Sequence, residues 1–169
     1  MKLRGFDWIR RAWERLRSSF HRNGNSRKTK RQETGEWGEA LAVRQLRKEG
    51  YTIAGQRVRP DARNDEIDII ARKDGYLVFV EVKTRKDERF GRPALAVDRR
   101  KRQALCRGAS AFIRRAHYPS LTYRFDIVEV VGSRDSPEPP VIRHIEDAFR
   151  FPKGRIFAKR AGPAQGATT

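Results

Sequence analysis

Residues 65–83, DEIDIIARKDGYLVFVEVK, decide the fold of this chain because they read as two apolar strands joined by a tight turn. Asp74-Gly75 at the centre is the strongest short-range signal for a two-residue β-hairpin. The predicted strands cover residues 66–72 and 76–83. Carboxylates are poor strand formers and are costly to bury, yet both strands carry them. These acids are therefore the first candidates for a functional role.

The two faces of the predicted hairpin differ in polarity. A two-residue turn makes the numbers of opposite residues sum to 149, so that Asp68 faces Glu81 and Glu66 faces Lys83. Nearer the turn the same face carries Ile70 and Phe79. The other face is apolar throughout, with Ile67, Ile69, Ala71, Val78, Val80 and Val82. A slip of one residue would expose that apolar face, so the alternation fixes the register.

Opposed carboxylates repel, so one of them holds a proton or a cation lies between them. The oxygens of Asp68 and Glu81 suit Mg²⁺ or Mn²⁺, which bind carboxylates, water and phosphate oxygens. With Lys83 on the same face, these groups could form a phosphoryl-transfer site, in which the lysine orients the attacking water or adds positive charge. The alternative is a structural cluster of ion pairs, and residue types alone do not separate the two.

A helix predicted from Thr34, as its cap, to Glu49 adds a third acid, Glu39. Glu39 shares its helical face with apolar residues, so it points toward the interior and requires a partner. The apolar residues are Ala42, Val43 and Leu46. We favour Glu39 as a third metal ligand, with Glu36 as the fallback. The alternative is a glutamate that is merely favoured by the helix dipole.

The remaining elements predict an α/β fold. Strands are expected over 51–58, 123–131 and 141–144, a loop over 60–64, and a helix over 97–115. The order helix, three strands, helix, two strands predicts a mixed central sheet flanked by helices. Four basic residues, Arg99, Arg100, Lys101 and Arg102, open the second helix. Cations there oppose the helix dipole, which favours an anionic partner, although a merely solvated basic turn fits equally well.

The charge of the chain is uneven. The net charge is +18, and residues 1–32 hold 11 Lys/Arg against 2 acids, while residues 153–169 hold 4 Lys/Arg and no acid. We therefore expect a domain over 33–152 between a basic N-terminal segment and a basic, disordered tail over 153–169. A basic protein favours polyanions, nucleic acid first and anionic membranes second. Tails that only aid solubility are the alternative.

The N-terminal segment predicts an amphipathic helix over 3–20, followed by a flexible linker over 21–32. The helix could dock on the domain, lie on an anionic membrane or contact nucleic acid, and the sequence leaves all three open. No apolar run spans a membrane, and no signal peptide is expected. Cys106 is the only cysteine, which fits a reducing cytoplasm.

Four blocks of the sequence resemble the YraN-like family of uncharacterised bacterial proteins. In chain order they are GEWGEALAVRQLRKEGYTI, EIDIIARKDGYLVFVEVKTR, AVDRRKRQAL and YRFDIVEV, within residues 35–150. That family is assigned to the restriction-endonuclease-like superfamily and is similar to archaeal Holliday-junction resolvases. The resemblance implies a three-layer core and an Asp…Glu-x-Lys nuclease motif, here Asp68, Glu81 and Lys83, with Glu39 as the helix acid. The family usually has glycine at the position of Asp65.

These observations together predict a cytoplasmic, nucleic-acid-binding endonuclease that uses Mg²⁺ or Mn²⁺. DNA, including branched DNA, is expected before RNA, and the resemblance to resolvases implies a homodimer. The expected phosphate contacts are Arg85, Arg99, Arg100, Lys101 and Arg102. One alternative is a non-catalytic DNA- or RNA-binding module that kept the nuclease fold. Another is a peripheral membrane contact through residues 3–20.

Overall fold

The structure is a computed structural model that describes residues 29–60, 65–89, 91, 97–115 and 122–151. The predicted helix over 3–20, most of the predicted linker and the tail over 153–169 lie outside these residues. No helix among the described residues is long and apolar enough to cross a membrane.

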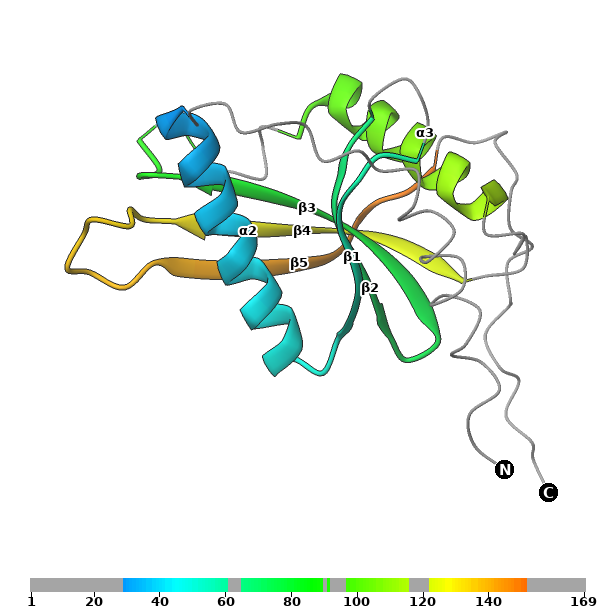
Figure 1. Ribbon diagram of the computed structural model, residues 1–169, viewed down its shortest axis with the longest axis horizontal. Coiled ribbons are helices and arrows are strands. Elements are labelled where there is room, and N and C mark those ends of the chain that lie inside the picture. Colours follow the sequence, from blue (N-terminus) through cyan, green and yellow to red (C-terminus); the bar gives the residue numbers. More distant parts are fainter. Residues whose placement is uncertain (1–28, 61–64, 90, 92–96, 116–121, 152–169) are drawn as a thin grey trace.

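The described chain forms one five-stranded mixed sheet with the order β1-β2-β3-β4-β5 (Figure 1). Its elements are α2 (Lys30–Lys48), β1 (Thr52–Val58), β2 (Ile67–Lys73), β3 (Tyr76–Arg85), α3 (Arg99–Arg115), β4 (Tyr123–Val131) and β5 (Val141–Phe149). Neighbouring strands are antiparallel except β3 and β4, which are parallel. Adjacent parallel strands require a crossover connection, and α3 lies in it.

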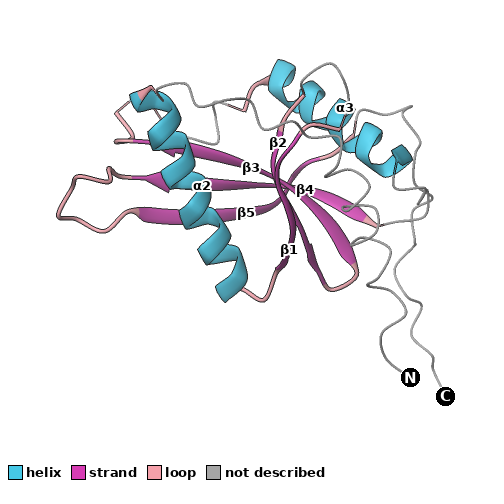
Figure 2. Cartoon of the chain, in the orientation of Figure 1, coloured by secondary structure: helices cyan, strands magenta, loops and turns pink. Residues whose placement is uncertain are grey.

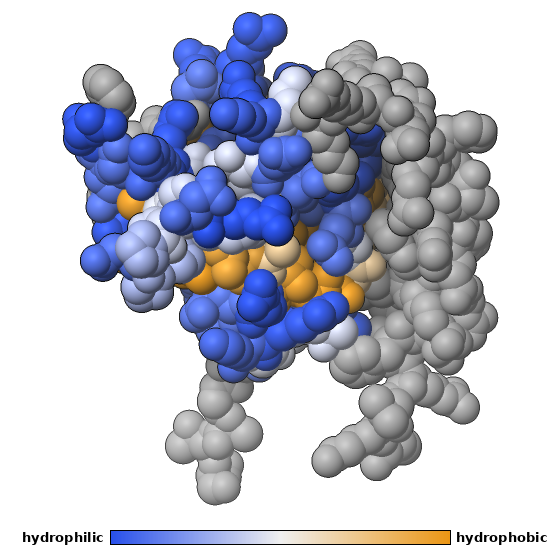
Figure 3. Space-filling view, turned by 60° about the vertical axis from the view of Figure 1, so that its left-hand side comes forward, coloured by the Kyte–Doolittle hydropathy of each residue, from blue (hydrophilic) through white to orange (hydrophobic). Residues whose placement is uncertain are grey.

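The two helices lie on opposite faces of the sheet (Figure 2). The face under α2 buries Val78, Val80 and Val128 against Ala42 and Leu46. The face under α3 buries a separate core that includes aromatic side chains, namely Phe79, Phe112 and Phe125. In the view of Figure 3 the described surface is largely hydrophilic, with one apolar strip between polar regions. The predicted three-layer α/β architecture with a mixed sheet is confirmed.

Helix α2 begins earlier than predicted. Thr29, not Thr34, is its N-cap, because Thr29 and Gln32 form a reciprocal capping box. Thr34 lies inside the helix, where its hydroxyl donates to the Lys30 carbonyl. The predicted flexible linker is therefore wrong for residues 30–32. The T-x-x-Q pattern was the sequence signal for the true start.

Strand β5 is longer than the predicted strand over 141–144. It continues to Phe149 because β4 and β5 shift register between Phe125 and Ile127 and remain paired beyond the shift. Asp147 in this part of β5 has a φ of 47°, in the left-handed region. The adjacent polar residues Glu146 and Asp147 interrupt the hydrophobic alternation, which is why the sequence pattern did not predict this part of the strand.

Candidate metal centre

The predicted hairpin register is confirmed from the turn to the middle of the strands. Asp74 and Gly75 both have positive φ, as a two-residue turn of this kind requires, and Lys73 pairs with Tyr76. The pairing follows the predicted sum of 149 as far as Ile69 with Val80. The apolar face packs under α2 as expected, with the exception of Ile67.

Beyond Ile69 the two strands separate, and the strict alternation fails. The ladder ends one pair short of Asp68 and Glu81, and Asp68 Oδ2 instead accepts a hydrogen bond from the Val82 N–H at 2.7 Å. Ile67, predicted on the α2 face, packs in the core under α3. Figure 1 shows β1 and β2 turning away from β3 here. The opening lets side chains from both faces of the sheet meet.

Three carboxylates converge at this opening. One oxygen each from Glu39, Glu66 and Asp68 lies within 4.8 Å of the other two, close enough for one metal ion to contact all three. Glu39 comes from α2, Glu66 immediately precedes β2, and Asp68 is the second residue of β2. Glu66 was predicted only to face Lys83. The divergence of the strands, which the sequence does not reveal, adds it to the site.

Glu81 provides the fourth carboxylate and is almost fully buried, at 1% exposed. Lys83 Nζ lies 2.7 Å from Glu81 Oε1, and Lys101 Nζ lies 3.1 Å from Glu81 Oε2. Lys83 thus stands beside Glu81 as the motif predicts. Lys101, expected to contact phosphate from the surface, instead reaches from α3 to a site carboxylate.

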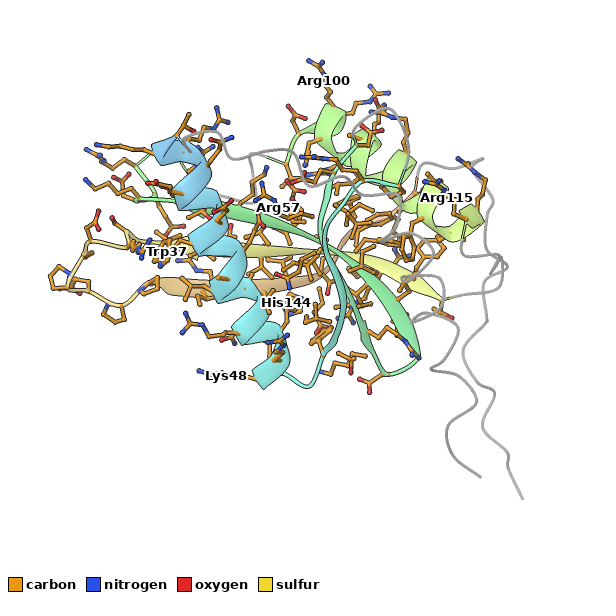
Figure 4. All side chains as sticks on the ribbon, viewed as in Figure 1. Trp37, Lys48, Arg57, Arg100, Arg115 and His144 are labelled. Atoms are coloured by element: carbon orange, nitrogen blue, oxygen red, sulfur yellow. The ribbon has the colours of Figure 1, made fainter. Side chains whose placement is uncertain are left out.

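Two arginines of β1 and the residues after it cover the α2 side of the cluster. Arg57 Nη1 lies 2.8 Å from Glu36 Oε1, while its Nε lies 3.8 Å from Glu39 and 3.6 Å from Glu66. Arg59 also pairs with Glu66. Arg57 has a φ of 51°, a strained conformation for a residue with a side chain. Figure 4 shows Arg57 between the two helices. Glu36, the fallback ligand, is thus engaged by Arg57.

Burial and mutual repulsion raise the pKa values of two acids of the cluster, Asp68 and Glu39. Burial, followed by the charge of Glu81, raises the pKa of Asp68 to about 8, although Lys101 and the Val82 N–H oppose the shift. Burial likewise raises the pKa of Glu39 despite Arg57. Burial lowers the pKa of Lys101, but Glu81 and Asp68 outweigh it and the net shift is upward. Glu81 and Asp68 therefore stabilise the charged form of Lys101.

Close packing of α2 on β3 fixes the position of Glu39. Gly38, the residue before it, is buried against Thr84, and a Cβ on Gly38 would lie 1.8 Å from the Thr84 hydroxyl oxygen. A larger residue at position 38 would therefore require either the Thr84 side chain or the helix to move. On the same helix, Gly35 has open space around it.

The start of α3 divides its four basic residues into two groups. Asp98 accepts a hydrogen bond from the Lys101 N–H at 2.8 Å, so an acidic cap offsets the cations that follow. Arg99, Arg100 and Arg102 are exposed, as is Arg85 at the end of β3. Arg100 marks this end of α3 in Figure 4, with Arg115 at the other end. Arg102 Nε donates to the Val97 carbonyl at 2.8 Å, and none of the three arginines of this turn reaches Glu81 as Lys101 does.

Asp65, which replaces the usual glycine of the resembled family, does not add a charge to the cluster. Its carboxylate accepts two hydrogen bonds from Arg107 of α3, at 2.8 and 3.0 Å. The side chain is 11% exposed. Asp65 therefore fastens the start of β2 to α3 and leaves the acids of the site unchanged.

A second polar cluster lies near the C-terminal end of α2. His144 Nδ1 lies 2.6 Å from Glu49 Oε2, and its Nε2 lies 2.8 Å from Asp126 Oδ2. Burial lowers the pKa of His144, but hydrogen bonds to Asp126 and Glu49 outweigh it and raise the value overall. Asp126, which is fully buried, also accepts from Arg124 and from the Asp147 N–H. The sequence analysis did not single out this cluster.

Comparison with known proteins identifies the family. The model of the uncharacterised protein family UPF0102 matches residues 38–130, which carry the hairpin, α3 and most of β4. This chain belongs to that family. A UPF0102 protein of Trichlorobacter lovleyi is 40% identical over 119 residues, which cover 70% of this chain and 91% of the relative. The UPF0102 protein RB9115 of Rhodopirellula baltica is 35% identical over 144 residues, covering 84% and 85%. The match confirms the predicted membership in an uncharacterised family.

A third relative, from Symbiobacterium thermophilum, is 45% identical over 101 residues, which cover 60% of this chain and 84% of the relative. The family description and the names of these relatives state no activity. The functional argument therefore depends on the chemistry of the site.

Proposed function

We propose that this UPF0102 protein binds nucleic acid and hydrolyses phosphodiester bonds with the help of Mg²⁺ or Mn²⁺. The observation that carries this proposal is the convergence of four carboxylates and Lys83 where β2 and β3 separate. Buried oxygens of Glu66 and Glu81 accept no hydrogen bond, although each faces a cationic side chain. A buried acceptor without a donor is costly, and a metal ion would satisfy it.

The donor set fits a hard divalent cation, because all its members are carboxylate oxygens. Asp68 and Glu39 of the predicted ligands, together with Glu66, have oxygens close enough to hold one ion. Glu81, whose charge acts on Asp68, would complete the set of carboxylate ligands. When bound, the ion would lower the pKa of a coordinated water and stabilise the charge that develops on the phosphate. Lys83 would orient the attacking water or contribute positive charge beside it.

The exposed basic residues supply the contacts to nucleic acid in this proposal. Arg85, Arg99, Arg100 and Arg102 are exposed, and the whole chain has a net charge of +18. Contacts of this kind position a phosphate backbone but do not read its sequence. The resemblance to junction resolvases favours DNA, including branched DNA, over RNA.

A second candidate is a nucleic-acid-binding module without catalysis. The observation in its favour is that the site acids already have cationic partners, Arg57, Arg59, Lys83 and Lys101. In this case the cluster would be a structural ion-pair network, and nucleic acid would bind equally well with and without divalent metal.

Exchange of Asp68 for Asn separates the two candidates. Asp68→Asn removes a charged ligand at nearly constant volume, so metal-dependent cleavage of branched, single-stranded and duplex DNA should fall about a thousandfold, equivalent to about 4 kcal/mol. Asp65→Asn is the matched control, because Asp65 pairs with Arg107 and not with the cluster. Unchanged cleavage in the Asp68 variant would refute the assignment. Metal-independent binding without cleavage in the unmodified protein would favour the second candidate.

A further inference from the structure

Lys101 holds an unusual position for a residue at the exposed start of a helix. Its backbone is fixed by the cap from Asp98, and its flexible side chain extends to Glu81. The side chain is 32% exposed, whereas the Glu81 side chain is only 2% exposed. Lys101 therefore links the solvent-facing turn of α3 to the most buried acid of the proposed metal site.

The two lysines around Glu81 are held differently. Lys83 lies on the same strand as Glu81, two residues away, and makes the shorter contact of 2.7 Å. Lys101 reaches the other oxygen from a different element, α3, at the longer distance of 3.1 Å. Of the two, Lys101 is the one whose side chain can withdraw to solvent with less disturbance.

The charge balance of the site determines what must happen to its cationic side chains when a metal ion binds. The four acids Glu39, Glu66, Asp68 and Glu81 provide at most four negative charges, and Arg57, Arg59, Lys83 and Lys101 already provide four positive ones. A divalent ion bound while all four cations stayed would leave an excess of positive charge in a largely buried place, where repulsion is poorly screened. A cationic side chain must therefore leave before a metal binds tightly, and of the two lysines that neutralise the buried Glu81, Lys101 is the more exposed.

We infer that Lys101 is an exchangeable counter-ion, which neutralises Glu81 in the metal-free protein and gives up this place when a divalent cation binds. The inference rests on the proposed metal site. The released ammonium group then stands on the same helical turn as Arg99, Arg100 and Arg102, where it becomes a further phosphate contact. Metal binding thus increases the positive charge that α3 offers to nucleic acid.

The test is a calorimetric titration of Mn²⁺ into full-length protein freed of nucleic acid. Lys101→Met removes the competing charge and should bind Mn²⁺ about tenfold more tightly than the unmodified protein. Arg100→Met is the matched control, since it removes the same charge from the same exposed turn and should change the Kd less than about twofold. Equal or weaker binding in the Lys101 variant would overturn the inference.

Thermal unfolding gives a second readout. Without metal, Lys101→Met should lower the Tm because it leaves Glu81 with one cation fewer, and Mn²⁺ should raise the Tm of this variant more than that of the unmodified protein. A lowered Tm that Mn²⁺ does not restore would mean that Lys101 is a permanent structural partner. If Lys101→Met does not fold, Lys101→Gln, which is neutral but can donate to Glu81, replaces it with the same expectation.

The outcomes also distinguish the proposed role of Lys101 from the proposed metal-dependent function. Normal Mn²⁺ binding by the unmodified protein and Arg100→Met, without a gain in Lys101→Met, would refute the exchange and leave the proposed function standing. No Mn²⁺ binding in any of these proteins would refute both.

Discussion

Two buried charge clusters of this molecule are built from similar residues but are satisfied to different degrees. Around Asp126, every partner is in place: both carboxylate oxygens accept hydrogen bonds, from Arg124, His144 and the Asp147 N–H. Around Asp68 and Glu81, carboxylates crowd one another, and one buried oxygen each of Glu66 and Glu81 faces a cationic side chain without a hydrogen bond. The difference teaches that burial of charge does not by itself identify a functional site, whereas incomplete satisfaction of buried charge does point to a missing ligand.

The clusters also lie at different places in the fold. Asp126 and His144 face the C-terminal end of α2 within the paired span of β4 and β5, where the ladder shifts register but continues on both sides of Asp126. Asp68 lies where the ladder between β2 and β3 has ended. A ladder that continues keeps its strands together, while the end of a ladder allows groups from α2 and α3 to meet.

Removal of the central acid should lower the stability much more in the Asp126 cluster than in the Asp68 cluster. Asp126→Ala should lower the free energy of unfolding by about 3–5 kcal/mol, because it leaves buried His144 and Arg124 without their shared partner. Asp68→Ala relieves repulsion with Glu81 and should cost about 1 kcal/mol or less. Urea denaturation of both variants measures the difference. Equal losses would mean that both clusters are structural.

The contact of α2 with β3 sharpens the comparison, because Gly38 lies directly beside Glu39 of the Asp68 cluster and at the opposite half of α2 from Glu49 of the other cluster. Gly38→Ala should destabilise the protein by about 1–3 kcal/mol and weaken Mn²⁺ binding, since the new methyl group collides with Thr84 and displaces Glu39. Gly35→Ala, in open space on the same helix, should stabilise it by about 0.5–1 kcal/mol and leave Mn²⁺ binding unchanged. Chemical denaturation and calorimetry test the pair. The same metal affinity in both variants would show that Glu39 is not a ligand.

The pH dependence of stability should reveal the cluster around His144. The pKa of His144 is raised in the folded protein, so its contribution is complete below the unfolded value of about 6.5 and is lost as pH rises through the folded pKa. Its neighbours there are Glu49 of α2, Asp126 of β4 and the ring of Tyr51. His144→Gln should remove a loss of on the order of 1 kcal/mol above pH 6.5. If the free energy of unfolding changed with pH in the same way in both proteins, the assignment to His144 would be contradicted.

The smallest effect is expected at the exposed arginines of α3. Arg100→Ala should weaken binding to duplex DNA by a few-fold and reduce the slope of log K against log salt by about 1, because one phosphate contact is lost. Mn²⁺ binding should not change. Fluorescence anisotropy at several salt concentrations measures the slope. An unchanged slope would remove Arg100 from the interface.

The sequence predicts the fold and half of the candidate site for identifiable physical reasons. Asp74-Gly75 fixes the hairpin register, and the register brings Asp68 toward Glu81 and Lys83. The prediction fails where the ladder ends, because the strands' divergence depends on tertiary packing. Ile67 therefore packs under α3 instead of α2, and Glu66 joins the carboxylates of the site, which the sequence analysis did not predict.

Lys101 illustrates the same limit for helices. Four consecutive basic residues look equivalent in the sequence, and only the cap by Asp98 and the docking of α3 decide which one reaches the site. The sequence analysis missed Arg57 of β1 because nothing in the residues around it signals its positive φ, and it missed Arg59, which follows the strand, as well. In contrast, the T-x-x-Q capping box at Thr29 was present in the sequence and sufficient to place the start of α2.

The measurement that tests the central claim most directly is the titration of Mn²⁺ into the unmodified protein, Asp68→Asn and Asp65→Asn, all free of nucleic acid. The account predicts at least one ion bound per chain, affinity at least about tenfold weaker in Asp68→Asn, and no change in Asp65→Asn. Binding of equal affinity in the unmodified protein and Asp68→Asn would contradict it, because the ion would then be held elsewhere.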